Sequence, residues 1–383
     1  MIKILSVFGT RPEAIKMAPL INLMQKNPHF QCVVCVTAQH RQMLDQVLEI
    51  FQIKPDFDLD IMKDRQSLTD IMVNSLTGLD NVIKEVKPDM LLVHGDTSTT
   101  FSGALAAFYN RVLLGHVEAG LRTFNKYYPF PEEINRKLTG VLADMHFSPT
   151  ENSKRNLIRE GVSEDNIFVT GNTVIDALKT TVNKNYVFVN PVLNKIDYNS
   201  RIILVTAHRR ENLGQPLENI CFAIKKIVEN YKDVELVYPV HMNPAVRDTV
   251  YSILGAQERV HLIDPIDVLE MHNLMDRCYL VLTDSGGLQE EAPSLGKPVL
   301  VLRSETERPE AIEFGTLKLA GTEMDSIYSL TSQLLEDKSE YDKMANAVNP
   351  YGDGFASERI CESILYRFGI LKERPMEFVP GHR

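Results

Sequence analysis

Residues that can move protons or bind an anion follow several short apolar runs in this 383-residue sequence. Asp96 follows the run MLLVH, Glu118 follows VLLGHV, and His208 follows IILVTA. A positioned carboxylate or imidazole can act as a general acid or base. The runs have the composition of buried strands, and ligands bind beyond the carboxyl ends of such strands in open α/β sheets. These positions therefore predict a functional site.

Other expected strand ends carry groups suited to binding a phosphate. Arg11 and Lys16 fall in the first turns of an expected helix, where cations oppose the helix dipole, so an anionic ligand would explain them better than solvent. Ser285, Gly286 and Gly287 join an expected strand to a helix. They form either an ordinary cap and tight turn or a loop whose backbone N–H groups reach a phosphate. The sequence leaves both interpretations open.

The candidate proton-transfer residues also have structural interpretations. Glu132 follows Pro131 at an expected helix start, where acids are common, and Asp96 could cap the helix after it. Glu118 has no comparable capping role, because Ala-Gly-Leu-Arg follows it. His208 precedes two arginines, which would lower its pKa, whereas a ligand phosphate would raise it.

Composition and missing motifs exclude several classes of protein. Lys and Arg total 41 against 51 Asp and Glu, a formal charge of −10, which argues against a nucleic-acid-binding protein. The absence of GxGxxG and GxxxxGKS/T disfavours a dinucleotide site or a P-loop, and no HExxH or Cys/His cluster predicts a metal. No apolar stretch is long enough to span a membrane. A polar N-terminal segment and five cysteines, with Cys32 and Cys35 inside one expected strand, favour a cytoplasmic protein with reduced thiols.

Apolar runs alternate with amphipathic stretches of helical length, which is the pattern of repeated β-α-β units. The length predicts two doubly wound α/β domains. The alternation weakens in an Asn-rich segment, so we expect a domain boundary between about residues 171 and 200. The pattern leaves a last helix at Ser357–Phe368 unassigned. The expected strands are Lys3–Phe8, Cys32–Thr37, Met90–His94, Val112–Val117, Met145–Phe147, Ile202–Thr206, Leu236–Val240, His261–Ile263, Leu280–Thr283 and Val299–Leu302.

Ten longer motifs together resemble the bacterial non-hydrolysing UDP-N-acetylglucosamine 2-epimerase family over residues 1 to about 354. They are GTRPEAIKMAPLI, TAQHRQMLDQVL, VHGDTSTT, GHVEAGLRT, PFPEEINRKL, TGNTVIDAL, VTAHRREN, YPVHMNPAVR, TDSGGLQEEAPSLGKPVLV and ETERPEA. The resemblance implies a glycosyltransferase-B type fold, in which two Rossmann-like doubly wound domains face a cleft. It implies an N-terminal domain at 1–171, a UDP-binding domain at 172–356, and a C-terminal helix within about 357–383 that packs back on the first domain.

The resemblance also implies an activity and its partners. Members of the family interconvert UDP-N-acetylglucosamine (UDP-GlcNAc) and UDP-N-acetylmannosamine (UDP-ManNAc) without NAD or metal, supply ManNAc for surface polysaccharides, and are commonly homodimers. Carried over to this chain, Asp96, Glu118 and Glu132 would surround the sugar and His208 would assist the departing diphosphate. The residues that would contact UDP are Arg11, Lys16, His208, Ser285, Gly286, Gly287, Glu291 and Arg308.

The family further implies a second UDP-GlcNAc molecule that activates the enzyme. The matching positions are Gln39, Gln42 and Arg65, with His241 nearby. The two glutamines could instead be solvated residues at a helix start. Where some relatives have Gln and Phe near the base, this chain has Ile266 and Met271, so backbone groups rather than aromatic stacking are expected to hold uracil.

The C2 hydrogen of the sugar becomes acidic only if the C1–O bond to the diphosphate loosens. We expect UDP to leave while a base removes the C2 proton, giving 2-acetamidoglucal, and to add back after protonation of the other face. Three carboxylates could supply proton-transfer groups on both faces, and which is base or acid stays open. The alternatives are a hydrolysing relative that releases ManNAc and UDP, a glycosyltransferase with an acceptor groove, and a nucleotide-sugar sensor without turnover.

Overall fold

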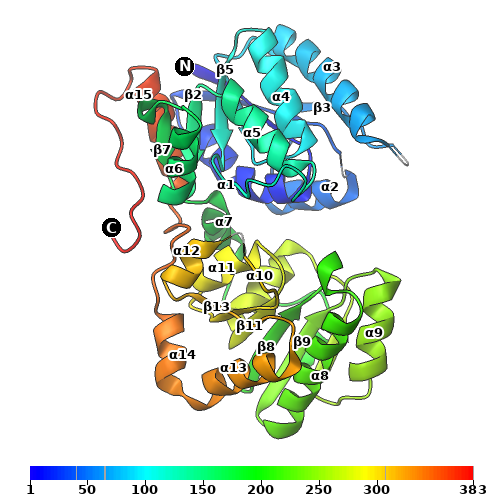
Figure 1. The fold of residues 1–383 in the computed structure, drawn as a ribbon. Coiled ribbons are helices and arrows are strands. Elements are labelled where there is room, and N and C mark those ends of the chain that lie inside the picture. The colour runs from blue at the N-terminus through cyan, green and yellow to red at the C-terminus, as the bar shows by residue number, and fades with distance from the viewer. Residues whose placement is uncertain (40, 64–65, 307, 383) are drawn as a thin grey trace. The chain divides into compact units, whose positions relative to one another are not determined.

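The computed structural model describes residues 1–39, 41–63, 66–306 and 308–382. The chain divides into two compact units: Met1–Thr180 with Tyr351–Arg383, and Thr181–Pro350. The boundaries expected from the sequence were 171 and 356. Each unit has helices packed on both faces of a parallel sheet (Figure 1). The predicted class, two Rossmann-like α/β domains, is confirmed.

The described part of the first unit contains one seven-stranded sheet in the order β3-β2-β1-β4-β5-β6-β7. Every residue of β4 is buried, which explains the uninterrupted apolar run MLLVH. β1 pairs with β2 on one side and β4 on the other, so the strand order reverses at β1. The strands are β1 (Ile2–Phe8), β2 (Phe30–Val36), β3 (Phe57–Asp58), β4 (Met90–His94), β5 (Leu113–Val117), β6 (Met145–Ser148) and β7 (Ile167–Val169).

Helix α1 packs against α2 and α15, and α4 packs against α3 and α5. The C-terminal helix α15 buries Ile360 and Ile364, which are four residues apart and therefore share one face. The segment after residue 350 thus completes the first unit. The helices are α1 (Arg11–Lys26), α2 (Arg41–Ile50), α3 (Leu68–Val86), α4 (Ser98–Tyr109), α5 (Glu132–Leu142), α6 (Glu151–Arg159), α7 (Thr173–Thr181) and α15 (Ala356–Arg367).

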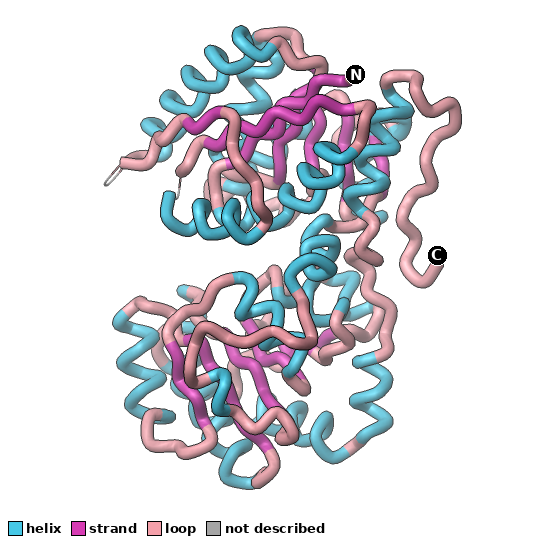
Figure 2. The backbone as a smooth tube through the Cα atoms, turned by 180° about the vertical axis from the view of Figure 1, so that it is seen from behind, coloured by secondary structure: helices cyan, strands magenta, loops and turns pink. Residues whose placement is uncertain are grey.

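The second unit repeats this plan with six strands among its described residues, in the order β10-β9-β8-β11-β12-β13. Its order reverses at β8, which pairs with β9 and β11. In each unit the strands lie between helices (Figure 2). The strands are β8 (Arg201–Thr206), β9 (Val234–Pro239), β10 (Val260–Ile263), β11 (Leu280–Thr283), β12 (Val299–Val301) and β13 (Leu317–Leu319).

The core of the second unit forms where α8 meets α9 and α13. Ile220, Ile224 and Ile227 recur at helical spacing on α8 and are fully buried in one apolar cluster with the sheet. The helices are α8 (Gln215–Asn230), α9 (Pro244–Leu254), α10 (Val268–Arg277), α11 (Leu288–Ser294), α12 (Pro309–Glu313), α13 (Met324–Glu336) and α14 (Lys338–Ala345).

All ten expected strands are present, with ends within two residues of those expected. The sequence analysis missed β3, β7 and β13, which are only two or three residues long and so carry no usable periodicity. Within the described ranges, no helix is long and apolar enough to cross a membrane. Cys32 and Cys35 both lie on β2 as free thiols.

Candidate active site

The carboxyl ends of β1, β4 and β5 bring the first group of predicted residues to one edge of the first sheet. Arg11 opens α1 directly after β1, Asp96 follows β4, and Glu118 follows β5. β1 and β4 are neighbours at the point where the strand order reverses. This is where open α/β sheets bind their ligands.

Glu118 is the most constrained of these residues. Its side chain is 8% exposed, and Oε1 accepts hydrogen bonds from Lys16 Nζ and, at 2.8 Å, from Asn172 Nδ2. Nε2 of buried His94 lies 3.7 Å from Oε2. The backbone at Glu118 has φ 61°, an unusual value for a residue with a side chain and one often found at functional sites. Lys16, expected to contact UDP, is thus bonded to Glu118 in this structure.

The charges around Glu118 keep it ionised. Burial would raise the pKa of Glu118, but the Lys16 ammonium and the Asn172 hydrogen bond outweigh burial and hold this pKa well below its ordinary value. Burial lowers the pKa of His94 to about 4, so the imidazole beside Glu118 is neutral near pH 7. While Lys16 is paired with it, this carboxylate is ionised but weakly basic, because a general base works best with a pKa near the working pH. Its basicity would rise if Lys16 moved away from it.

Asp96 and Glu132 are connected through helix α5. Asp96 forms an ion pair with Arg136 of α5, and its carbonyl accepts a hydrogen bond of 3.0 Å from Asn135 Nδ2. Glu132 is the first residue of α5, one turn before Arg136 and on the same face. The structure therefore brings Asp96 and the start of α5 together.

The neighbouring acid, Glu133, has a different role. It is 3% exposed and accepts hydrogen bonds from the backbone N–H groups of Thr123 (3.1 Å) and Phe124 (2.9 Å). Glu133 therefore holds the loop before α5, whereas Glu132 is half-buried at the helix start. The local sequence pattern is the same for both acids, and only the family resemblance singled out Glu132.

The start of α1 contains a buried acid that the sequence analysis missed. Glu13 accepts hydrogen bonds from the backbone N–H groups of Gly9 (3.1 Å) and Thr10 (2.8 Å) and from the hydroxyls of Thr97 (2.7 Å) and Thr100 (3.0 Å). Burial raises the pKa of Glu13, and these bonds oppose the increase. Glu13 joins the loops after β1 and β4, while Arg11 is exposed beside them. The signal available in the sequence was the capping pattern Thr10-x-x-Glu13.

Two of the positions expected to bind an activator, Gln39 and Gln42, follow the carboxyl end of β2 in the same sheet. Gln39 Oε1 accepts a 3.3 Å hydrogen bond from Thr99 Oγ1, which ties it to the start of α4. Gln42 is exposed in the first turn of α2. Arg65 lies outside the described residues. His241 belongs to the second unit.

In the second unit, the reversal between β8 and β11 positions His208 and Asp284. Asp284 directly follows β11 and is completely buried. Its Oδ2 accepts hydrogen bonds from the backbone N–H groups of His208 (2.7 Å) and Arg209 (2.8 Å) and from Asn212 Nδ2 (3.0 Å). Nothing local in the sequence connects Asp284 to His208, because the two residues are 76 positions apart.

The His208 imidazole stacks on that of His241, with ring centroids 5.1 Å apart and planes 6° apart. Its side chain is 41% exposed. Burial lowers the pKa of His208, the Asp284 carboxylate opposes this, and His241 and Arg209 reinforce it. The predicted phosphate-binding residue His208 and the predicted activator residue His241 are therefore in direct contact.

The Ser285–Gly287 loop leads from Asp284 into α11 and meets Arg308. A Cβ on Gly286 would lie 2.7 Å from Arg308 Nη1, so a larger residue at this position would displace the guanidinium from its present place. Arg308 Nε donates a 2.6 Å hydrogen bond to Glu290, which is 1% exposed. The structure thus combines a bare backbone turn with a fixed cation, an arrangement suited to a phosphate.

Glu291 lies on the other side of this turn. A Cβ on Gly287 would lie 3.1 Å from Glu291 Oε1, and His272 Nε2 lies 3.4 Å from Glu291 Oε2. Ile266 precedes α10 and Met271 lies within it, and both are half-buried. Among the described side chains, no group of three or more His, Cys, Asp or Glu is arranged to hold a metal ion.

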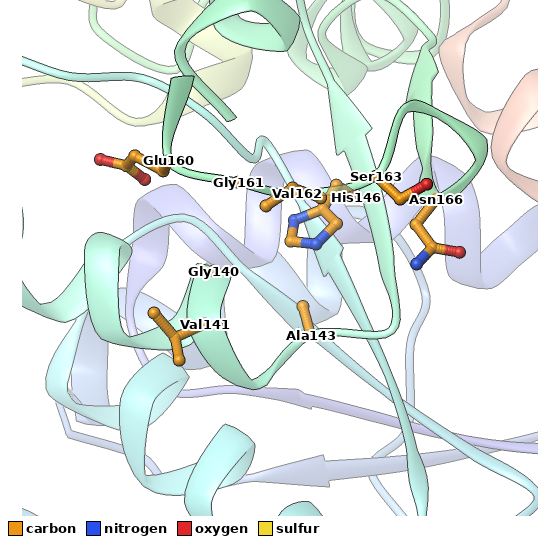
Figure 3. Close-up of a pocket in the computed structure, with 9 residues that line it drawn as sticks. All are labelled: Gly140, Val141, Ala143, His146, Glu160, Gly161, Val162, Ser163 and Asn166. Carbon is orange, nitrogen blue, oxygen red and sulfur yellow. The ribbon is translucent and has the colours of Figure 1, made fainter. Parts of the chain in front are cut away.

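A separate cavity of about 310 Å³ lies at the amino ends of β6 and β7 (Figure 3). Burial lowers the pKa of His146, which lines it, to about 4. The predicted site residues follow the carboxyl ends of strands, so this cavity is not their site. The lining residues are Gly140, Val141, Ala143, His146, Glu160, Gly161, Val162, Ser163 and Asn166.

Comparisons with known proteins give one consistent family. Residues 22–365 match the family described as UDP-N-acetylglucosamine 2-epimerase. A curated UDP-N-acetylglucosamine 2-epimerase of Bacillus subtilis is 59% identical over 98% of this chain and 98% of its own length. A co-structure of S. aureus MnaA with UDP matches with 52% identity and a TM-score of 0.90, covering 99% of this chain and 100% of that one. The UDP-GlcNAc 2-epimerase of Neisseria meningitidis bound to UDP-GlcNAc matches with 51% identity and a TM-score of 0.88, covering 95% of this chain and all of that one.

Proposed function

Since the chain belongs to the UDP-N-acetylglucosamine 2-epimerase family, we propose that it interconverts UDP-GlcNAc and UDP-ManNAc without hydrolysing them. The observation that carries this proposal is the buried Glu118 carboxylate, which follows β5 at the same edge of the sheet as Asp96 after β4 and remains ionised there. Epimerisation at a carbon atom needs a base to remove the proton, and the ionised Glu118 gains the basicity for that role when Lys16 shifts its interaction away.

The proposed reaction proceeds by elimination and re-addition. The electron pair of the C1–O bond leaves with the β-phosphate of UDP, and the electron pair of the C2–H bond forms the C1=C2 double bond of 2-acetamidoglucal. A carboxylate takes the proton. A second acid then delivers a proton to C2 from the opposite face, and the β-phosphate oxygen attacks C1 again. Asp96, Glu118 and Glu132 supply these proton-transfer groups.

The departing diphosphate needs positive charge and hydrogen-bond donors. Arg308, His208 and the backbone N–H groups of the Ser285–Gly287 loop supply them in the second unit. Glu291, beside the same turn, would contact UDP as a hydrogen-bond acceptor. Arg11 and Lys16 supply cations in the first unit. We propose that Lys16 moves part of its interaction from Glu118 to the diphosphate when substrate binds.

Turnover in D₂O, followed by proton NMR, tests this mechanism. If the C2 proton leaves to one group and returns from another, product UDP-ManNAc carries deuterium at C2, and recovered UDP-GlcNAc gains it with time. Added NAD should make no difference. Product that keeps its original C2 hydrogen after many turnovers would contradict proton exchange between two groups and leave direct transfer or hydride chemistry.

The same experiment separates the alternative functions. A hydrolysing epimerase would accumulate free ManNAc and UDP, whereas the proposed enzyme reaches a stable mixture of two UDP-sugars. A glycosyltransferase would require an added acceptor for any product to form. A sensor would bind UDP-GlcNAc tightly and leave it unchanged.

We also propose that UDP-GlcNAc activates the enzyme through Gln39, Gln42 and Arg65, with His241 connecting this second site to the diphosphate site. The stacking of His241 on His208 supports that connection. Pure UDP-ManNAc should then react slowly until a trace of UDP-GlcNAc is added. An immediate full rate from pure UDP-ManNAc would contradict the activation.

A homodimer is the proposed assembly. Helix α5 exposes three apolar side chains, Ile134, Leu138 and Val141. Their spacing of four and three residues places them in one stripe along the helix, which packs beside α4, as α4 packs beside α3. A second copy would cover this stripe, and Leu138→Glu should shift the sedimentation of the protein toward the monomer. We further propose that the reaction takes place in the cytoplasm and supplies ManNAc units for surface polysaccharide.

A further inference from the structure

His208 and Asp284 are brought together by two neighbouring strands. His208 lies two residues beyond the end of β8, and Asp284 lies one residue beyond the end of β11. The two strands pair in parallel with Thr206 opposite Thr283, and Asp284 N donates a 3.0 Å hydrogen bond to Thr206 O. The relative position of these side chains is thus set by the centre of the sheet.

The two carboxylate oxygens of Asp284 have different environments. Oδ2 accepts three hydrogen bonds from the 208–212 segment, at 2.7, 2.8 and 3.0 Å. Oδ1 is buried and accepts no hydrogen bond from the described residues, and Nδ1 of His208 lies 3.7 Å from it. Buried polar atoms without a hydrogen bond are rare in proteins, so Oδ1 is an acceptor available to the nearby His208 ring.

We propose that Asp284 is the positioning residue for His208: when a nucleoside diphosphate binds, Oδ1 accepts a hydrogen bond from Nδ1–H, and Nε2 is thereby directed at the diphosphate. This proposal rests on the proposed function only for the identity of the ligand. A carboxylate on one ring nitrogen fixes the tautomer and stabilises the protonated imidazole. His208 can then donate to the leaving β-phosphate and return to the same orientation for re-addition.

Protonation of His208 depends on the charge of Asp284, because the other groups around the ring oppose it. Burial, His241 stacked on its ring and the adjacent Arg209 all disfavour protonation of His208, and Asp284 is the group that favours it. A diphosphate adds negative charge on the Nε2 side. Binding of UDP should therefore raise the pKa of His208, and loss of the Asp284 charge should reduce that increase.

Asp284→Asn removes the charge and keeps the shape. Its control is Asn212→Ala, which removes one hydrogen bond to Oδ2 but leaves the carboxylate in place. The readouts are the ¹⁵N shifts of the His208 imidazole against pH, with and without UDP, and the UDP dissociation constant. His208→Gln identifies the signal among the ten histidines.

We expect Asp284→Asn to lower the His208 pKa in the UDP complex and weaken UDP binding at least about tenfold at pH 7, while Asn212→Ala keeps the His208 pKa. If Asp284→Asn and Asn212→Ala have equal His208 pKa values, Asp284 only holds the 208–212 loop in place, and the proposal is overturned.

The unmodified chain provides a test that does not depend on the variant folding. A proton on Nδ1 of His208 in the UDP complex supports the proposal, and the tautomer with the proton only on Nε2 overturns it. Neither readout requires turnover, so a failure of epimerisation would be recognised separately by the product assay.

Discussion

Replacing Lys16 by methionine removes the cation from the buried Glu118 carboxylate while keeping most of the side-chain volume. The two side chains are 14% and 8% exposed, so water cannot replace the lost ammonium group. Removing one partner of a buried ion pair costs about 3–5 kcal/mol, against about 0–1 kcal/mol for an exposed pair. We therefore expect Lys16→Met to lower the Tm of the first unit by about 6–20 °C, at about 2–4 °C per kcal/mol.

The lowering of Tm in Lys16→Met should become smaller as the pH falls. Burial opposes the Glu118 charge, but Lys16 and Asn172 outweigh it, so the pKa of Glu118 is lowered in the folded chain. The pair therefore stabilises the fold above the unfolded pKa of about 4.5, and this stability is lost as the pH falls through the folded pKa. In Lys16→Met the pKa of Glu118 rises, because its partner cation is gone. Protonation of Glu118 at lower pH then removes the unpaired buried charge and reduces the destabilisation of the variant. The Tm difference from the unmodified protein should shrink between about pH 8 and about pH 5.

Scanning calorimetry at several pH values measures this effect, with Glu118→Gln and the double variant completing a cycle. Glu118→Gln removes the charge that Lys16 neutralises, so the double variant should recover part of the stability lost in Lys16→Met. The exposed pair Lys84–Asp80 provides the control, with side chains 64% and 34% exposed. A loss in Lys16→Met no larger than in Lys84→Met, or a double variant without recovery, would refute the reasoning.

Substitutions at the site carboxylates and at three glycines test other parts of this structure. Neutral variants of the three site carboxylates should each lower kcat about 10²-fold or more while UDP-GlcNAc binding persists, and near-normal turnover would remove that residue from the mechanism. Gly286→Ala places a methyl group 2.7 Å from Arg308 Nη1 and should weaken UDP binding in calorimetry; unchanged affinity would separate Arg308 from the diphosphate. Gly9→Ala places a methyl group 2.0 Å from a threonine hydroxyl and should destabilise the fold by about 1–3 kcal/mol, whereas Gly140→Ala on α5 should be nearly neutral in thermal unfolding. The carboxylate variants are Asp96→Asn, Glu118→Gln and Glu132→Gln.

The fold class and the neighbourhood of the candidate site can be predicted from the order of the amino acids. Buried parallel strands read as continuous apolar runs, so β4 and β11 could be placed to the residue. Ligands bind at the carboxyl ends of such strands, so the polar residues that follow them could be named as candidates. Both inferences use only neighbours in the sequence.

Only the tertiary structure decided which residues interact. Lys16 and Glu118 are 102 positions apart, and Asp284 and His208 are 76 apart, so no local pattern connects them. The adjacent acids Glu132 and Glu133 have equal local propensity, yet the fold uses Glu133 to hold a loop and leaves Glu132 at the helix start. Periodicity reports which face of an element is buried, whereas the protonation state and orientation of a side chain depend on groups that reach it from other strands and helices.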